Sequence, residues 1–143
     1  MTLADRVKQD LTSAMKAGEK DRVGALRLVL SELQKDAKEG AGDELAVLRR
    51  ERKRRNESAT AFRDAGRPEL AEAEEAEAKV IAAYLPAELS DDELRAIVRD
   101  AVAESGASSP KDMGAVMKAA MPKVAGRADG KRVSALAQEA LRG

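Results

Sequence analysis

Residues 89–102, Leu-Ser-Asp-Asp-Glu-Leu-Arg-Ala-Ile-Val-Arg-Asp-Ala-Val, decide the fold class. Ser90 and Glu93 have the spacing of a capping box, and acids in a first turn favour the positive end of a helix dipole. Apolar residues then follow at i, i+3, i+4, i+7 and i+8, which is one face of a helix. The same spacing occurs twice more, so three helices with one apolar stripe each predict a compact bundle. The stripes are Leu94-Ile97-Val98-Ala101-Val102, Met113-Val116-Met117-Ala120-Met121 and Val133-Leu136-Ala137-Ala140-Leu141.

Local signals predict the end of the first of these helices and the start of the second. Gly106 should end the first helix, since glycine readily takes the left-handed conformation that follows a helix. Ser109 and Asp112 again have capping-box spacing, which predicts the start of the second helix. The end of that helix is left open at Pro122, because a proline ring there clashes with the carbonyl of Lys118.

Residues 1–88 carry the signals of four longer helices that fold back on one another as hairpins. The predicted fold is therefore all-α, with a hairpin subdomain at residues 1–88 and a three-helix subdomain at residues 89–143. The expected bounds of the first four helices are Thr2 to the stop at Gly18, Lys20 to Lys38, the cap at Asp43 to Ala65 before Gly66, and Pro68 to about Tyr84.

The composition excludes several chemistries. The 143 residues include 26 bases and 26 acids but no cysteine and no histidine, so disulfides, thiolate catalysis and the commonest general base are missing. Phe62 and Tyr84 are the only aromatics, which disfavours reading of splayed RNA bases and favours a folded RNA recognised by shape. No run is long enough for a membrane span and the first residues do not resemble a signal peptide, so we expect a cytoplasmic protein without membrane partners.

Neither metal nor cofactor chemistry is indicated. The acids at residues 91–93 are explained by the start of a helix, and those at residues 74–77 have no histidine or second cluster to complete a coordination shell. No nucleophile is paired with a base, and neither a P-loop nor a dinucleotide fingerprint is present. We therefore expect no catalytic residue, no metal and no cofactor.

The surplus of positive charge lies in the last 34 residues, 110–143, which hold seven bases and three acids. Lys111 and Lys118 are seven apart, which predicts one outer helix face. Asp129 is placed to cap the last helix, whose free N–H groups, flanked by basic residues, would form a seat for phosphate. The alternative is that the glycines only make a turn and the lysines only add solubility. The candidate RNA-binding residues are Lys111, Gly114, Lys118, Lys123, Gly126, Arg127, Gly130, Lys131 and Arg132.

A second basic run, residues 49–55, holds six bases in seven positions. On a helix these bases spread around the whole circumference, so they cannot form one flat patch. If the two flanking helices fold back at the Gly66 turn, Glu77 comes level with Arg55. We favour a charge ladder across that hairpin, with direct RNA contact as the alternative.

The chain resembles the YqeY-like proteins over essentially its whole length. The resemblance extends to Lys16-x-x-Glu19-Lys20-x-Arg22 and Arg27 near the N-terminus. The most specific segments are Tyr84-Leu85-Pro86-x-x-Leu89-Ser90-x-x-Glu93-Leu94, Asp112-Met113-Gly114-x-Val116-Met117 and Met121-Pro122-Lys123-Val124-x-Gly126-Arg127-Ala128-Asp129-Gly130.

This family is similar in its C-terminal third to the tail domain of the GatB component of the tRNA-dependent amidotransferase, the enzyme that makes Gln-tRNA and Asn-tRNA from mischarged precursors. In that enzyme the tail is helical and contacts the body of the tRNA. The resemblance therefore implies an all-α protein with a tRNA-binding-type module. The shared core would be Val116-Met117-Lys118, Gly126, Ala128, Val133 and Leu136.

Three functions remain open at this level. The first is a non-catalytic accessory protein that binds tRNA or another structured RNA, but not DNA, through the C-terminal helices. The second is a protein-interaction adaptor for an amidotransferase or an aminoacyl-tRNA synthetase. The third is the carbon–nitrogen ligase activity, with glutamine as amide donor, that the family label suggests; no residue here matches the Ser/Lys machinery of the amidase.

Overall fold

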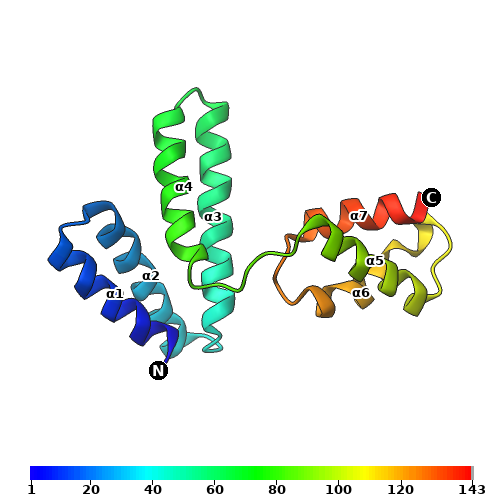
Figure 1. Ribbon diagram of the computed structural model, residues 1–143, viewed down its shortest axis with the longest axis horizontal. Coiled ribbons are helices and arrows are strands. Elements are labelled where there is room, and N and C mark those ends of the chain that lie inside the picture. Colours follow the sequence, from blue (N-terminus) through cyan, green and yellow to red (C-terminus); the bar gives the residue numbers. More distant parts are fainter. Residues whose placement is uncertain (143) are drawn as a thin grey trace. The chain divides into compact units, whose positions relative to one another are not determined.

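A computed structural model of the protein describes residues 1–142 and bears out the all-α prediction. The described residues form seven α-helices and one 3₁₀ turn, and they contain no β-strand. The chain divides into two compact units, of which the N-terminal one ends at Pro86 and the C-terminal one begins at Ala87. Each unit has its own apolar core, and each is described below by itself (Figure 1).

The N-terminal unit consists of two helical hairpins. The first joins α1 (Leu3–Ala17) to α2 (Lys20–Glu39), and the second joins α3 (Glu44–Asp64) to α4 (Pro68–Ala82). The hairpins meet because α2 packs against both α3 and α4 (Figure 1). Their shared core is aliphatic apart from one tyrosine, and its fully buried members include Val7, Leu26, Val29, Leu48 and Ile81.

The expected capping signals set most helix ends in this unit. Thr2 and Asp5 form the capping box of α1, Gly18 ends that helix in the left-handed conformation, and Asp43 caps α3. A further cap was not predictable from local sequence. The carboxylate of Glu44 accepts hydrogen bonds from the backbone N–H groups of residues 3 and 4, at 3.1 and 2.9 Å, and so ties the start of α1 to the start of α3.

The fourth helix ends at Ala82, two residues before the expected end at Tyr84. The chain tightens there, because the N–H groups of Tyr84 and Leu85 bond to carbonyls three residues back rather than four. Tyr84 is buried, its hydroxyl donates to the carboxylate of Asp10, and the guanidinium of Arg6 lies 5.3 Å from the ring centroid. These contacts hold the residues that follow α4 against α1.

The C-terminal unit is a bundle of α5 (Asp91–Ser105), α6 (Met113–Val124) and α7 (Gly130–Arg142), with the 3₁₀ turn η1 (Pro110–Asp112) leading into α6. Each helix packs against the other two. Ser90 and Glu93 form the expected capping box, and Gly106 ends α5 in the left-handed conformation. The core is aliphatic throughout, and Leu94, Val98, Val116, Val124 and Val133 are fully buried within it.

Two members of the predicted apolar stripes do not belong to the core. Met121 is 38% exposed, and Ala140 is also on the surface. Met121 lies eight residues after Met113, which is about 80° more than two full turns of an α-helix, so its side chain rotates away from the core. The last positions of the other two stripes, Val102 and Leu141, remain at the core. Val124, eleven residues after Met113, takes the place expected for Met121. Pro122 does not stop α6, because the helix ends only two residues later and little of it lies beyond the missing hydrogen bond.

Candidate nucleic-acid interface

The basic tail does not make the C-terminal unit basic as a whole. From Ala87 to the end, the sequence holds nine basic and nine acidic residues, because α5 and the segment before it are rich in acids. Electrostatic attraction of a polyanion therefore depends on which individual cations are left exposed and unpaired. The candidate residues fall into two groups by this criterion.

The first group is bonded within the unit. The Arg127 guanidinium donates to the Ala87 carbonyl at 2.9 Å, and the Arg127 carbonyl accepts from the Leu89 N–H at 2.8 Å. Arg132 donates to the Leu89 carbonyl at 3.0 Å and to the Asp91 carboxylate at 2.8 Å, and this hydrogen bond lowers the pKa of Asp91. The two arginines thus hold the segment before α5 against the start of α7.

Lys123 also has an internal partner. Its ammonium group lies 2.8 Å from the Glu104 carboxylate of α5, and this hydrogen bond raises the pKa of Lys123. Both side chains are solvent-exposed, so the pair contributes little to stability, and a stronger anion could displace the carboxylate.

The start of α7 is occupied by a carboxylate of the chain itself. Asp129 accepts from the Lys131 backbone N–H at 2.9 Å, which confirms the predicted cap. A phosphate at this position would have to compete with that negative charge. The turn before it is tightly wound, because Ala125 and Gly126 both have positive φ, of 50° and 75°. Ala125 is the only non-glycine residue with positive φ in the described chain.

The second group consists of Lys111, Lys118 and Lys131. All three are exposed, and within the described residues none of their side chains forms a hydrogen bond or ion pair. Lys118 lies on α6, whereas Lys111 belongs to η1, so the expected single α-helical face is instead a 3₁₀ turn continuing into a helix. Gly114 lies between these two lysines, and a Cβ there, or at Gly130, would meet no atom within 4 Å. Another backbone can therefore approach both glycines closely.

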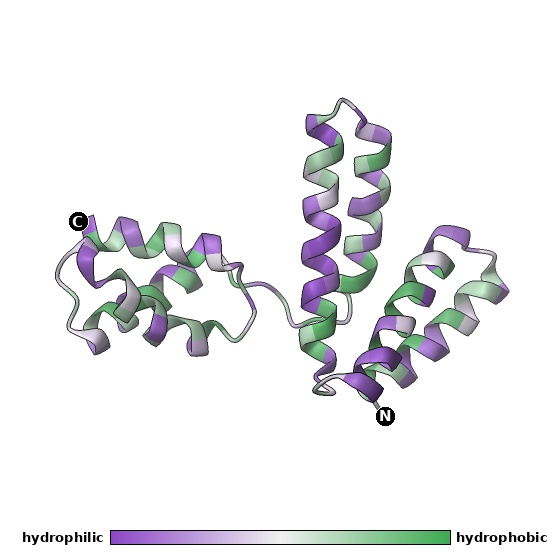
Figure 2. Ribbon diagram, turned by 180° about the vertical axis from the view of Figure 1, so that it is seen from behind, coloured by the Kyte–Doolittle hydropathy of each residue, from purple (hydrophilic) through white to green (hydrophobic). Residues whose placement is uncertain are grey.

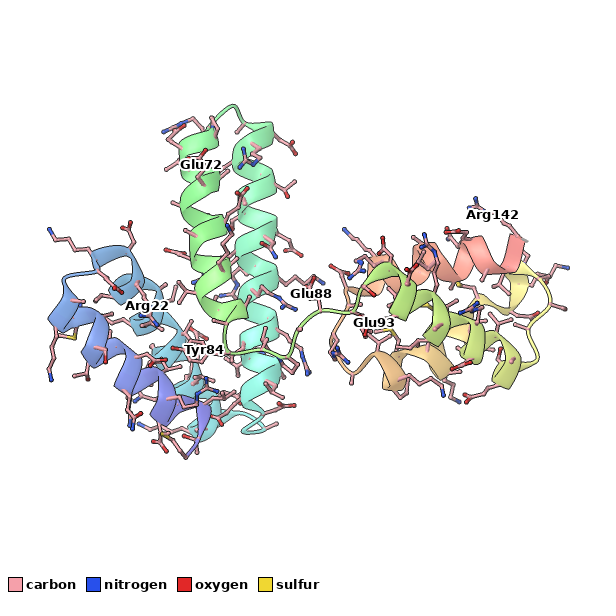
Figure 3. All side chains as sticks on the ribbon, in the orientation of Figure 1. Arg22, Glu72, Tyr84, Glu88, Glu93 and Arg142 are labelled. Carbon is pink, nitrogen blue, oxygen red and sulfur yellow. The ribbon has the colours of Figure 1, made fainter. Side chains whose placement is uncertain are left out.

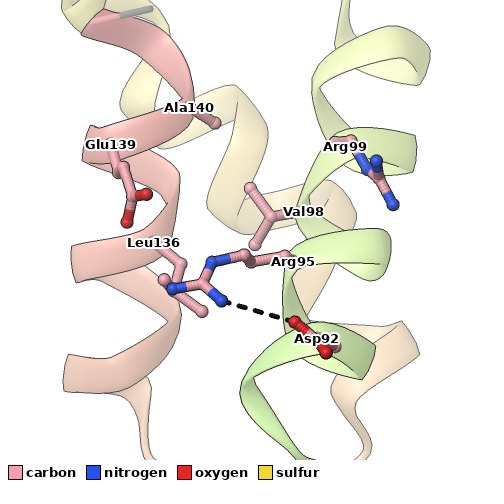
Figure 4. Close-up of a pocket in the computed structure, with 7 residues that line it drawn as sticks. All are labelled: Asp92, Arg95, Val98, Arg99, Leu136, Glu139 and Ala140. Carbon is pink, nitrogen blue, oxygen red and sulfur yellow. Dashed lines mark hydrogen bonds and ion pairs between the residues drawn. The ribbon is translucent and has the colours of Figure 1, made fainter.

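An open hollow of about 380 Å³ between α5 and α7 was not predicted from the sequence. Val98, Leu136 and Ala140 supply its apolar part, and charged side chains surround them (Figure 4). Arg95 spans part of the opening and pairs with Asp92 at 3.5 Å. Two cations and two carboxylates line this hollow, so its charges favour neither sign of ligand.

Residues 4–141 match the sequence model of a family described as "Yqey-like protein". The chain belongs to this family. A comparison with the curated proteins finds no match.

The described residues of this Yqey-like protein contain no cluster of three or more acidic, histidine or cysteine side chains that could hold a metal ion. None of the described helices is long and apolar enough to cross a bilayer.

The arginine run at residues 49–55 has the structural role that we favoured. Hydrophilic residues cover the middle of α3 (Figure 2), and Arg55 bonds to Glu77 of α4 at 3.3 Å. Further along the hairpin, Arg63 pairs with Glu75 at 2.7 Å. The charge ladder between α3 and α4 is therefore confirmed.

One member of this network was missed. Glu51 is only 1% exposed, and its carboxylate lies 2.8 Å from the guanidinium of Arg55, which is itself buried. The signal was present in the spacing, because Glu51 follows Leu48 by three residues and precedes Ala59 by eight, on the same apolar side of the helix.

Proposed function

We propose that this Yqey-like protein is a non-catalytic RNA-binding protein that holds tRNA, or another structured RNA, through its C-terminal unit. The observation that carries the proposal is the set of three exposed lysines without internal partners, Lys111, Lys118 and Lys131. Lysines of this kind bind phosphate as point charges and release counterions when they do so. The open glycines at positions 114 and 130 allow a sugar–phosphate backbone to come close.

The roles of the candidate residues differ within this proposal. Arg127 and Arg132 act by positioning, because their guanidinium groups already hold the segment before α5. Lys123 contacts RNA only if phosphate replaces Glu104 as its partner. The resemblance to the tail domain of the amidotransferase supports tRNA as the RNA, and the scarcity of aromatic residues supports recognition by shape.

The test is a titration of total tRNA against the full-length protein over a series of salt concentrations. The variant Lys111→Ala/Lys118→Ala/Lys131→Ala should bind more weakly, and the slope of log affinity against log salt should fall by about 2 to 3, since each lost phosphate contact removes roughly 0.7–0.9. The matched control is Lys8→Ala/Lys16→Ala/Lys53→Ala, which removes three exposed lysines of the N-terminal unit.

Circular dichroism would establish that both variants are folded. Equal affinities and equal salt slopes for the two variants would contradict the proposal, as would the absence of salt-dependent binding by the natural protein.

A further inference from the structure

The outer face of α2 carries a row of cations that the proposed function does not use. At about 100° per residue, Lys20, Arg27 and Lys38 fall within about 20° of one another around the helix, and Lys35 lies about 60° from them. Gly24, Ser31 and Gln34 fill the positions between these cations, and no acidic residue falls in this sector. We call Lys20, Arg27, Lys35 and Lys38 the α2 basic face.

All four side chains of the α2 basic face are exposed and unpaired. In the described chain none of them forms an ion pair or a side-chain hydrogen bond. Other cations of the same unit are paired, among them Arg22 with Glu19 on the first turn of α2, Arg54 with Glu51 and Arg63 with Glu75. Other exposed lysines of the unit, such as Lys8, Lys16 and Lys53, are unpaired as well, so what distinguishes the α2 basic face is that four unpaired cations share one side of a single helix.

The acids of α2 lie on a different side of the helix. Glu32, Asp36 and Glu39 line an open hollow together with Arg50 and Arg54 of α3, and Lys35 also lines it. Asp21 lines a second hollow, beside α4. Glu32, Asp36 and Glu39 of α2 thus lie on the side of the second hairpin, whereas Lys20, Arg27 and Lys38 are exposed on another side of the helix. A face sorted in this way presents a positive potential even though the N-terminal unit has no net charge.

The chemistry of the face favours a sugar–phosphate backbone over a membrane. A helix that lies in a membrane surface needs an exposed apolar side, but the apolar side of α2, including Leu26, Val29 and Leu33, is buried in the core. Among the described residues of α2, Leu28, at 42%, is the only large apolar side chain that is exposed. A Cβ at Gly24 would meet no atom within 4 Å, so a backbone can approach there, and Ser31 and Gln34 add hydrogen-bond donors suited to phosphate and sugar oxygens.

We propose that the α2 basic face is a second phosphate-binding surface of this protein and that it contacts the backbone of a structured RNA. It extends about 27 Å from Lys20 to Lys38, which is enough to reach several consecutive phosphates. The choice of RNA as ligand rests on the proposed function, but contact at α2 does not depend on the C-terminal lysines. A protein with one basic surface in each unit would hold a folded RNA at two places.

Lysine acylation of the full-length protein, followed by mass spectrometry, tests the two surfaces separately. With saturating total tRNA, acylation of Lys20, Lys35 and Lys38 should fall several-fold, while Lys8 and Lys53 stay fully reactive. Unchanged acylation at α2 would overturn this inference, whatever happens at the C-terminal lysines. Protection at α2 without protection of those lysines would support it and count against the proposed function. Protection by vesicles of phosphatidylcholine and phosphatidylserine, but not by tRNA, would also overturn it.

A variant provides the second measurement. Replacing all four cations, Lys20→Ala/Arg27→Ala/Lys35→Ala/Lys38→Ala, should lower the salt slope of tRNA binding by about 3, because up to four phosphate contacts are lost. The control Lys8→Ala/Lys16→Ala/Lys53→Ala should leave the slope unchanged. A slope for the α2 variant equal to that of the control would overturn the inference.

Discussion

The α3–α4 hairpin and the C-terminal bundle contain similar mixtures of charge and use them in opposite ways. In the hairpin, Arg55 and Arg63 are paired with glutamates of α4, and the buried Glu51 belongs to the same network. In the bundle the core is wholly aliphatic, and Lys111 and Lys118 remain exposed and unpaired. The more basic stretch of sequence thus supplies a buried ion pair through Arg55, whereas Lys111 and Lys118 stay accessible to a ligand.

The difference follows from the two kinds of cation. Arginine has a planar, weakly hydrated guanidinium group that can be buried and can donate to two carboxylates at once, as Arg55 does to Glu51 and Glu77. Lysine is a strongly hydrated point charge that tends to stay in water. A count of positive charges cannot separate these uses, but the identity of the residue and its phase on the helix can.

The largest expected loss of stability comes from breaking the buried ion pair between Arg55 and Glu51. Arg55→Ala should destabilise the N-terminal unit by about 3 to 5 kcal/mol, because it leaves Glu51 charged and buried without its main partner. Urea unfolding followed by tyrosine fluorescence measures this, since Tyr84 is the only tyrosine, the chain has no tryptophan, and Tyr84 lies in that unit. A loss below about 1 kcal/mol would mean that the pair behaves like a surface one.

Two further variants serve as controls for the loss at Arg55. Glu51→Met/Arg55→Met should cost less than Arg55→Ala alone, because no charge then remains buried. In the bundle, Leu94→Ala should cost about 3 kcal/mol through a cavity, and this loss should not depend on salt.

A smaller loss of stability is expected at Tyr84, which follows α4 and contacts α1 within the N-terminal unit (Figure 3). Tyr84→Phe removes the hydrogen bond to Asp10 and should cost about 1 to 2 kcal/mol at neutral pH. Burial, with the bond to Asp10, raises the pKa of Tyr84 to about 12, so the folded state keeps the hydroxyl neutral at pH values where the unfolded chain has lost the proton.

The stability that Tyr84 contributes should decrease as the pH rises. Because the pKa is raised on folding, the contribution of Tyr84 to stability is complete below pH 10 and is lost as the pH rises toward 12. The difference in stability between the natural protein and Tyr84→Phe should therefore shrink over this range, in urea unfolding followed by circular dichroism. An absorbance titration of the phenolate in the natural protein should have its midpoint near pH 12. A midpoint near 10 would contradict the burial of this hydroxyl.

The smallest effect compares the two capping boxes. Ser90→Ala should cost the C-terminal unit about 1 kcal/mol, the usual loss of an N-cap. Thr2→Ala should cost less, because the Glu44 carboxylate still accepts from the N–H groups of Leu3 and Ala4 at the start of α1. Thermal unfolding of the two variants tests this order, and a larger loss at Thr2 would show that the Glu44 cap is ineffective.

Most of the fold could be predicted from the sequence, because its signals are local. Capping residues lie within three positions of the N–H groups that they accept from, and left-handed glycines directly follow the helices that they end. The apolar stripes were correct except at Met121 and Ala140, which are exposed near the C-terminal ends of α6 and α7. The hydrogen bond between Tyr84 and Asp10 could not be predicted, because the two residues are 74 positions apart in the sequence.

The candidate site also has some features that follow from local sequence and others that depend on the tertiary structure. The sequence by itself determined which residues are basic, which glycines make turns, and that Asp129 caps α7. Only the tertiary structure decided that Arg127 and Arg132 bond to a segment about 40 residues earlier, and that three of the lysines have no partner. The physical reason is that the start of a helix depends on capping residues a few positions away in the sequence. Whether a charged side chain has a partner depends instead on every element that packs beside it in the folded protein.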